Sequence, residues 1–151
     1  MAQQVHVDIS VFGDKQLQRA LKALPINVEK KVVRQALRKA AKPVLDTAKS
    51  LVPVKTGALK KSLKLRALRK QKRGQFGVQV MTGTREQLGI AADDPYYYPM
   101  AVEVGTAKAP AHPFMRPALD QNREATYRLV AELVRTGITR ATVELGGKAS
   151  G

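Results

Sequence analysis

The sequence of 151 residues contains no cysteine and no tryptophan. The absence of cysteine excludes disulfide bonds and thiolate metal sites, and it fits folding in a reducing compartment. No apolar run approaches the roughly 20 residues that a membrane-spanning helix needs, so we expect no contact with a membrane. The first residues lack the basic and apolar segments of a signal peptide. We therefore expect a soluble protein whose length suits one domain.

Residues that commonly carry catalysis or hold metals are also scarce. The two histidines, His6 and His112, lie in unrelated contexts, and neither has a partner at a metal-binding spacing. The Asp-Asp-Pro sequence at 93–95 is typical of a turn rather than of a cation site. The Gly-Gly-Lys sequence at 146–148 lacks the upstream glycine of a phosphate-binding loop. The sequence therefore predicts neither an enzyme nor a protein with a cofactor or a metal site.

Acidic residues are scarce in the first half of the chain, and this scarcity accounts for the whole net charge of +15. Residues 1–75 hold 19 Lys and Arg against 4 Asp and Glu, a net of +15, whereas residues 76–151 hold 8 against 8. Such an asymmetric field favours a negatively charged neighbour, either nucleic acid or an acidic protein. A solubilising surface is the alternative interpretation.

Alternating apolar and polar residues predict a small antiparallel sheet. The alternation occurs in three segments, at residues 4–12, 62–70 and 75–82. The second and third segments flank a hairpin tip that is rich in Lys and Arg, and a further edge strand near residues 100–105 would extend the sheet. Residues 83–95 form a polar loop, and a loop of this length is usually functional or mobile.

Helical spacing of apolar residues predicts two long helices, over residues 27–51 and 115–143. Pro43 lies inside the first of them. Because the apolar spacing continues past this proline, we expect one kinked helix rather than two. A short helix capped by Asp14 and a single helical turn capped by Thr56 are also expected.

These elements together predict an α+β fold. A small antiparallel sheet is packed on one face by two long helices and one short helix. The fold forms a single domain over residues 1–145, and residues 146–151 form a flexible C-terminal tail.

The long helix over residues 27–51 carries its cations on one face. At about 100° per residue, five basic residues fall on a narrow stripe opposite the apolar face: Lys31, Arg34, Arg38, Lys42 and Lys49. The hairpin tip adds four more cations: Arg69, Lys70, Lys72 and Arg73. We call these nine residues the basic face. Since Phe12 is the only aromatic residue among the first 75, the basic face suits phosphates or an acidic protein rather than stacking on bases. A solvated helix surface is the alternative.

Four motifs follow one another along the chain. They are an Ala/Arg/Lys-rich helix with an internal proline, a Pro-x-x-Thr-Gly-x-Leu turn, a Tyr…Val-Glu-x-Gly-Thr segment and a His-Pro-Phe-Met-Arg-Pro-Ala segment, at residues 32–51, 53–59, 98–106 and 112–118. In this order and spacing they resemble the tail-component, or tail-completion, proteins of tailed bacteriophages. The resemblance covers most of residues 14–135. It departs from the family pattern at Val104, where an aromatic residue is more usual.

The resemblance implies a structural virion protein of the head–tail junction, or neck, assembled in the host bacterial cytoplasm. Such a protein would form a homo-oligomeric ring that joins the tail tube or tail terminator to the head connector. The ring would surround the DNA channel, where it could contact DNA through phosphates. A basic, sequence-independent nucleic-acid-binding protein outside any virion is the alternative function.

Residues near the proline-rich segment are the candidates for subunit or partner contacts: Tyr97, Tyr98, Glu103, Gly105, Thr106, His112, Pro113, Phe114 and Arg116. Exposed tyrosines favour protein interfaces, and a proline-stiffened segment loses little entropy when it docks. Glu103 and Arg116 could form charged contacts between neighbours. We also expect Phe114 and Met115 to be buried and to anchor the segment.

Overall fold

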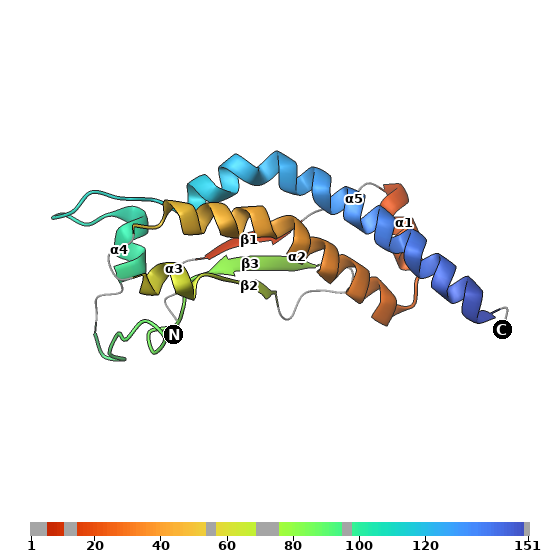
Figure 1. The fold of residues 1–151 in the computed structure, drawn as a ribbon, viewed down its shortest axis with the longest axis horizontal. Coiled ribbons are helices and arrows are strands. Elements are labelled where there is room, and N and C mark those ends of the chain that lie inside the picture. Colours follow the sequence, from red (N-terminus) through yellow and green to blue (C-terminus); the bar gives the residue numbers. More distant parts are fainter. Residues whose placement is uncertain (1–5, 11–14, 54–56, 69–75, 95–97, 150–151) are drawn as a thin grey trace.

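The computed structural model describes residues 6–10, 15–53, 57–68, 76–94 and 98–149 (Figure 1). Two long helices and a small antiparallel sheet dominate the fold, which confirms the predicted α+β class. In chain order the elements are β1 (His6–Ser10), α1 (Lys15–Lys22), α2 (Ile26–Leu51), α3 (Ala58–Ser62), β2 (Lys64–Ala67), β3 (Gly77–Met81), α4 (Tyr98–Val104) and α5 (Met115–Ala149).

The three predicted strands are confirmed, within shorter bounds than the alternation indicated. β3 lies between β1 and β2 and pairs antiparallel with both. Val80 of β3 lies opposite Val7 of β1 and Leu65 of β2, which defines the register across the sheet. Because β3 is the central strand and is covered by α2, its residues Val78 and Val80 are fully buried.

The predicted edge strand near residues 100–105 is wrong, because Tyr98–Val104 forms the helix α4 instead. Pro99 lies at the second position of α4, within the first helical turn, where no backbone N–H is needed and the fixed φ of proline suits the helix. The helix ends at Val104, and the N–H of the following Gly105 donates to the Ala101 carbonyl over 2.8 Å. The proline at the start of this segment is therefore better accommodated by a helix.

α2 is one continuous helix that passes through Pro43, which confirms the predicted continuity, whereas the kink expected there stays a prediction. Its buried face consists mainly of small apolar residues: Val33, Ala36, Leu37, Ala40, Ala41, Val44 and Ala48. These small side chains let both α5 and the sheet pack closely on α2. The approach is close at Gly137 of α5, where an added Cβ would lie 2.7 Å from Cγ1 of Val32. Further along, the Asn122 amide of α5 donates to Thr47 Oγ1 of α2 over 2.9 Å.

The ends of several elements differ from expectation. Asp14 and Thr56, the two predicted caps, lie outside the described residues. Gly57, with a φ of 73°, precedes α3 directly. α5 continues to Ala149, past the predicted end at 143 and into the predicted tail. The flexibility of the tail and the single domain over residues 1–145 stay predictions.

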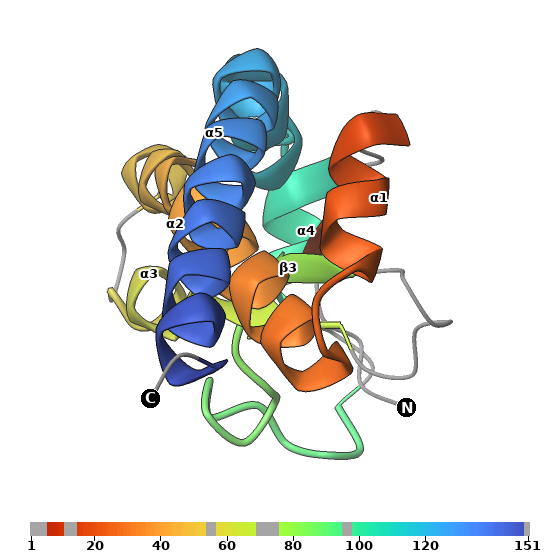
Figure 2. The ribbon, with the colours of Figure 1, turned by 90° about the vertical axis from the view of Figure 1, so that its right-hand side faces the viewer.

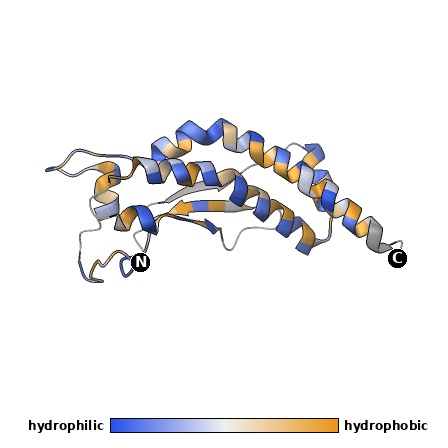
Figure 3. Cartoon of the chain, in the orientation of Figure 1, coloured by the Kyte–Doolittle hydropathy of each residue, from blue (hydrophilic) through white to orange (hydrophobic). Residues whose placement is uncertain are grey.

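The molecule is elongated along its two long helices (Figure 1). Viewed down that axis, α5 and α2 lie side by side over the sheet, and α1 lies on the opposite side of α2 from α3 (Figure 2). Hydrophobic residues concentrate on β3, whereas the outer turns of α5 near its start are hydrophilic (Figure 3). α4 and the segment that follows it lie at one end, and the C-terminal part of α5 extends past the other end (Figure 1).

Candidate assembly interface

Residues 105–113, which we call the connector, join α4 to α5. Gly105 starts the connector with a φ of 78°, a conformation that L side chains rarely adopt. A Cβ at this position would also lie 2.8 Å from the backbone N of Ala111. The chain therefore reverses so tightly at Gly105 that glycine is required there. The connector runs out from the body of the protein and back again (Figure 1).

Hydrogen bonds donated by backbone N–H groups hold the two arms of the connector together. The Thr106 N–H donates to the Ala109 carbonyl over 2.9 Å, and the Ala109 N–H donates to Thr106 Oγ1 over 3.1 Å. At the base, the His112 N–H donates to the Val102 carbonyl of α4 over 2.7 Å. Although residues 106–113 are all exposed, these bonds give the connector a defined shape. Pro110 and Pro113 restrict it further.

The Glu103 carboxylate of α4 caps the first turn of α5. Oε2 accepts the N–H groups of Phe114, at 2.8 Å, and Met115, at 3.1 Å. Oε1 accepts the N–H of Arg116, also at 3.1 Å. The first N–H groups of a helix have no partner within the helix, and a negative charge there also interacts favourably with the helix dipole. Glu103 therefore ties together α4 and α5 across the base of the connector.

This role of Glu103 was not predicted from the sequence, which suggested a charged contact with a neighbouring subunit. Helix-capping patterns in sequence place the acceptor within a few residues of the helix start. Here the acceptor lies 11 residues before Phe114, its first partner, and on another helix. A local pattern cannot identify such a cap. The predicted contact between Glu103 or Arg116 and a neighbour stays a prediction.

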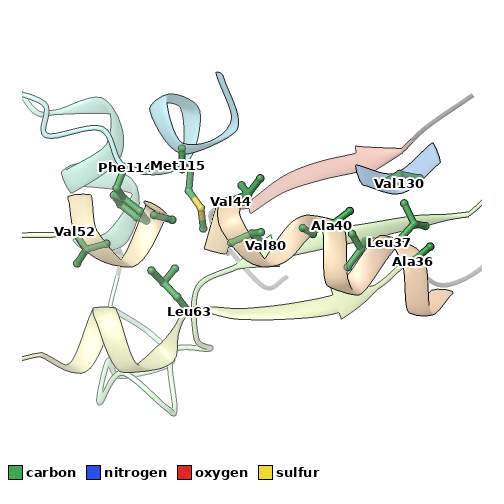
Figure 4. Packing of buried hydrophobic residues seen from close by; sticks show 14 of the residues in the cluster. Ala36, Leu37, Ala40, Val44, Val52, Leu63, Val80, Phe114, Met115 and Val130 are labelled. Carbon is green, nitrogen blue, oxygen red and sulfur yellow. The ribbon is translucent and has the colours of Figure 1, made fainter. Parts of the chain in front are cut away.

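Phe114 and Met115 are buried, as predicted, with exposed fractions of 0% and 1%. Both side chains point from the start of α5 into the layer that also holds Val44, Val52 and Leu63 (Figure 4). Because Phe114 is enclosed by its own chain, any effect on a subunit interface is exerted through the position of the connector. The side chain thus anchors the connector to the core.

The other predicted interface residues gather at the same end of the molecule. Thr106, His112, Pro113 and Arg116 are exposed, and Tyr98 is half-buried against the core. Tyr97 lies outside the described residues. α4 adds two exposed apolar side chains one helical turn apart: Met100, 42% exposed, and Val104, 64% exposed. Val104, where the sequence departs from the family pattern, thus lies at the surface beside the connector.

The part of the basic face that the structure describes lies along α2. Lys31, Arg34, Arg38 and Lys42 are exposed, and Lys49 is half-buried. The hairpin cations Arg69, Lys70, Lys72 and Arg73 lie outside the described residues. On the N-terminal half of α2, side chains of that helix alone line an open hollow of about 450 Å³, which we call the groove: Asn27, Lys30, Lys31, Arg34, Gln35 and Arg38. Lys30 was not predicted for this surface, because it falls off the stripe at ideal helical spacing.

The polar loop after β3 is folded rather than extended. The N–H groups of Leu88 and Ile90 donate to the carbonyls of Thr84 and Arg85, at 3.0 and 2.8 Å. The Arg85 guanidinium donates to the carbonyl of Asp94 over 2.7 Å and so closes the loop. Leu88 and Ile90 are half-buried and pack against the core. The loop therefore presents its remaining residues on a defined scaffold.

Metal sites and membrane-spanning helices are absent from the described parts of the chain. No group of three or more His, Asp or Glu side chains there is arranged to hold a metal ion. None of the helices formed by these residues combines the length and the apolar character needed to cross a membrane.

Comparison with protein families identifies the class of protein to which this fold belongs. Residues 15–112, from the start of α1 into the connector, match the family model HK97-gp10_like, described as "Bacteriophage HK97-gp10, putative tail-component". The chain therefore belongs to this family of phage tail components, as its motifs indicated. Neither the curated proteins nor the solved structures gave a match. As a tail component, the protein is a structural protein of a phage virion and interacts with other phage proteins, and this membership favours a non-enzymatic function.

Proposed function

We propose that this protein completes the phage tail by forming a homo-oligomeric ring at the head–tail junction. The ring joins the tail tube or tail terminator to the head connector and surrounds the DNA channel. The proposal rests on the connector, which lies at one end of this tail component and is held in a defined shape. Residues 106–113 of the connector are all exposed, yet its shape is maintained by Glu103, Gly105 and the bond from His112 to Val102.

A preformed projection suits a protein that joins two assemblies. An exposed segment that is already ordered loses little conformational entropy when it binds a partner. The side chains around its base are suitable for contact, because Met100 and Val104 expose apolar surface beside the polar groups of the connector. Interfaces commonly combine an apolar centre with a polar rim.

The basic face suits a position near the DNA channel. Lys31, Arg34, Arg38 and Lys42 are exposed and can neutralise phosphates without reading bases. Contact of this kind would weaken with salt, since surface charges are screened over about 8 Å at physiological ionic strength. DNA or an acidic neighbouring protein could both meet this face within the ring.

Complementation of a gene deletion tests the connector end directly. A plasmid copy of the wild-type gene should restore infectious particles, whereas Val104→Glu should not, because it places a charge in the proposed contact beside the connector. Val104 is 64% exposed, so the substitution should leave the fold intact. Tyr127→Glu, at an exposed position in the middle of α5, serves as the matched control and should restore titre. Full restoration by Val104→Glu would argue against an interface at this end.

A further inference from the structure

We propose that the groove beside the N-terminal half of α2 binds the acidic loop of a second copy of this chain. The acidic loop comprises residues 83–94, the folded loop that follows β3, and the groove residues are Asn27, Lys30, Lys31, Arg34, Gln35 and Arg38. This inference rests on the ring proposed above and names the two surfaces that would build it.

The groove has the charge and the accessibility of a docking site for an acidic segment. Four of the six groove residues are cations, and all four are exposed: Lys30, Lys31, Arg34 and Arg38. Asn27 and Gln35 add side-chain amides that can donate to carboxylates or carbonyls. The two arginine guanidinium groups match carboxylates in charge and geometry, and the two lysines add positive charge.

The acidic loop has the complementary charge and a stable shape. Glu86, Asp93 and Asp94 outnumber its one cation, Arg85, and all three acidic residues are exposed. Bonds from Arg85 to the carbonyls of Asp94 and Ala91, at 2.7 and 3.4 Å, hold the two sides of the loop together.

The root of the loop is fixed as well. The Gly83 N–H donates to Ser62 Oγ over 3.0 Å, and a Cβ at Gly83 would lie 2.7 Å from Cβ of Ser62. With its base held against α3 and its apolar residues Leu88 and Ile90 against the core, the loop presents Glu86 and Asp93 to a partner at little ordering cost.

The position of the two surfaces requires that the contact be between molecules. The acidic loop lies by the C-terminal end of α2, and the groove lies by the N-terminal half of the same helix (Figure 1). At 1.5 Å per residue, these positions are on the order of 30 Å apart. A molecule cannot place its own loop in its own groove, but it can place the loop in the groove of a neighbour. Two different, complementary surfaces give head-to-tail contacts, which generate a ring when the rotation closes.

DNA is the other candidate for the groove, and the structure favours the loop. The groove lies toward one end of the elongated molecule. Lys42 and Lys49, the other described residues of the basic face, lie outside the groove, toward the other end of α2. A second copy also supplies a preformed acidic partner, so no further component is needed. Contact of the groove with DNA is therefore kept as one outcome of the test.

Cross-linking in assembled particles tests the contact, since the chain has no cysteine of its own. The variant with Asp93→Cys and Arg34→Cys, supplied to the deletion phage, should give a ladder of covalent multimers with a short bismaleimide. The variant with Asp93→Cys and Lys39→Cys is the matched control, because Lys39 is exposed on α2 but does not line the groove. Equal ladders from both, or no ladder while the protein is present in the particles, would overturn this contact and leave the proposed function standing. Absence of the protein from the particles would overturn both.

Charge exchange provides a second, independent measurement of self-assembly. Glu86→Lys with Asp93→Lys, or Lys31→Glu with Arg34→Glu, should each weaken assembly by about 100-fold, since like charges across an interface are strongly unfavourable. All four changes in one chain should restore assembly. Lys22→Glu with Lys39→Glu, a matched reversal of two exposed lysines that belong neither to the groove nor to the basic face, should leave assembly unchanged. If the groove reversal impairs assembly but the loop reversal does not, the groove contacts another polyanion such as DNA and the proposal is wrong. Failure of the four-fold variant to assemble, or equal impairment of the control, would also overturn the proposal.

Discussion

The two regions that organise this protein are held together by different physical means. Between α2 and α5, small residues such as Ala40, Ala41 and Gly137 let backbones approach, and order comes from close packing. At the connector, order comes from one carboxylate and a few backbone hydrogen bonds around exposed residues. The first region should tolerate polar changes at its surface and resist changes of volume. The second should depend on single polar groups.

Phe114 is the point where the two regions meet, and its removal should have the largest effect on stability. Phe114→Ala should cost about 3–5 kcal/mol, because a fully buried ring is replaced by a cavity. Chemical denaturation of the purified protein measures the loss. Tyr127→Ala, an aromatic truncation at a position that is 54% exposed, is the control and should have little effect. A loss below about 1 kcal/mol with normal assembly would show that Phe114 is neither core nor anchor.

Removal of the Glu103 carboxylate should affect the connector more than the core. Glu103→Ala should cost about 2 kcal/mol, since it leaves three N–H groups at the start of α5 without their acceptor. Glu103→Gln keeps one acceptor oxygen and should cost less. Hydrogen exchange should show faster exchange at Phe114, Met115 and Arg116 than in the wild type. Unchanged exchange at these three amides in Glu103→Ala would contradict the capping role.

A larger side chain at the contact between α2 and α5 should lower stability less than the two changes above. A compensating smaller side chain on the opposite helix should restore most of the loss. Gly137→Ala should cost about 1–2 kcal/mol, because its Cβ would lie 2.7 Å from Cγ1 of Val32, which is a side chain and can shift. Val32→Ala should recover most of that loss in the double variant. Thermal unfolding of the four proteins gives the coupling energy directly. Additive losses would mean that the two helices do not meet at these residues.

Charge reversal on α2 should have the smallest effect on stability and a large effect on function. Arg34, Arg38 and Lys42 are exposed, so reversing all three should change stability by only about 0.5 kcal/mol. Joining of heads to tails should nevertheless fail, because these cations face a negative surface in the proposed ring. A triple variant that folds and gives normal titres would show that the basic face is only a solvated surface.

The sequence predicts the packed region better than the connector, for physical reasons. The face of α2 follows from the period of its apolar residues, and continuity of that period past Pro43 predicted one helix. The burial of Phe114 and Met115 follows from their large apolar side chains, which were expected to anchor the segment. Local patterns of this kind depend on neighbouring residues only.

The features that the sequence did not predict depend on contacts between residues that are distant in sequence. The strand predicted at residues 100–105 is instead a helix, and the carboxylate of Glu103 on that helix caps α5. The groove includes Lys30, which lies outside the ideal stripe. The spacing of apolar residues within one helix indicates neither a cap supplied by another helix nor a groove between side chains. The candidate site was therefore only partly predictable from the sequence.

Electron microscopy of particles made without this gene tests the central claim most directly. If the protein completes tails and joins them to heads, the deletion should produce DNA-filled heads that are not attached to functional tails, and plasmid-borne wild-type protein should restore joined particles. Normal, infectious and fully joined particles in the deletion would contradict the claim.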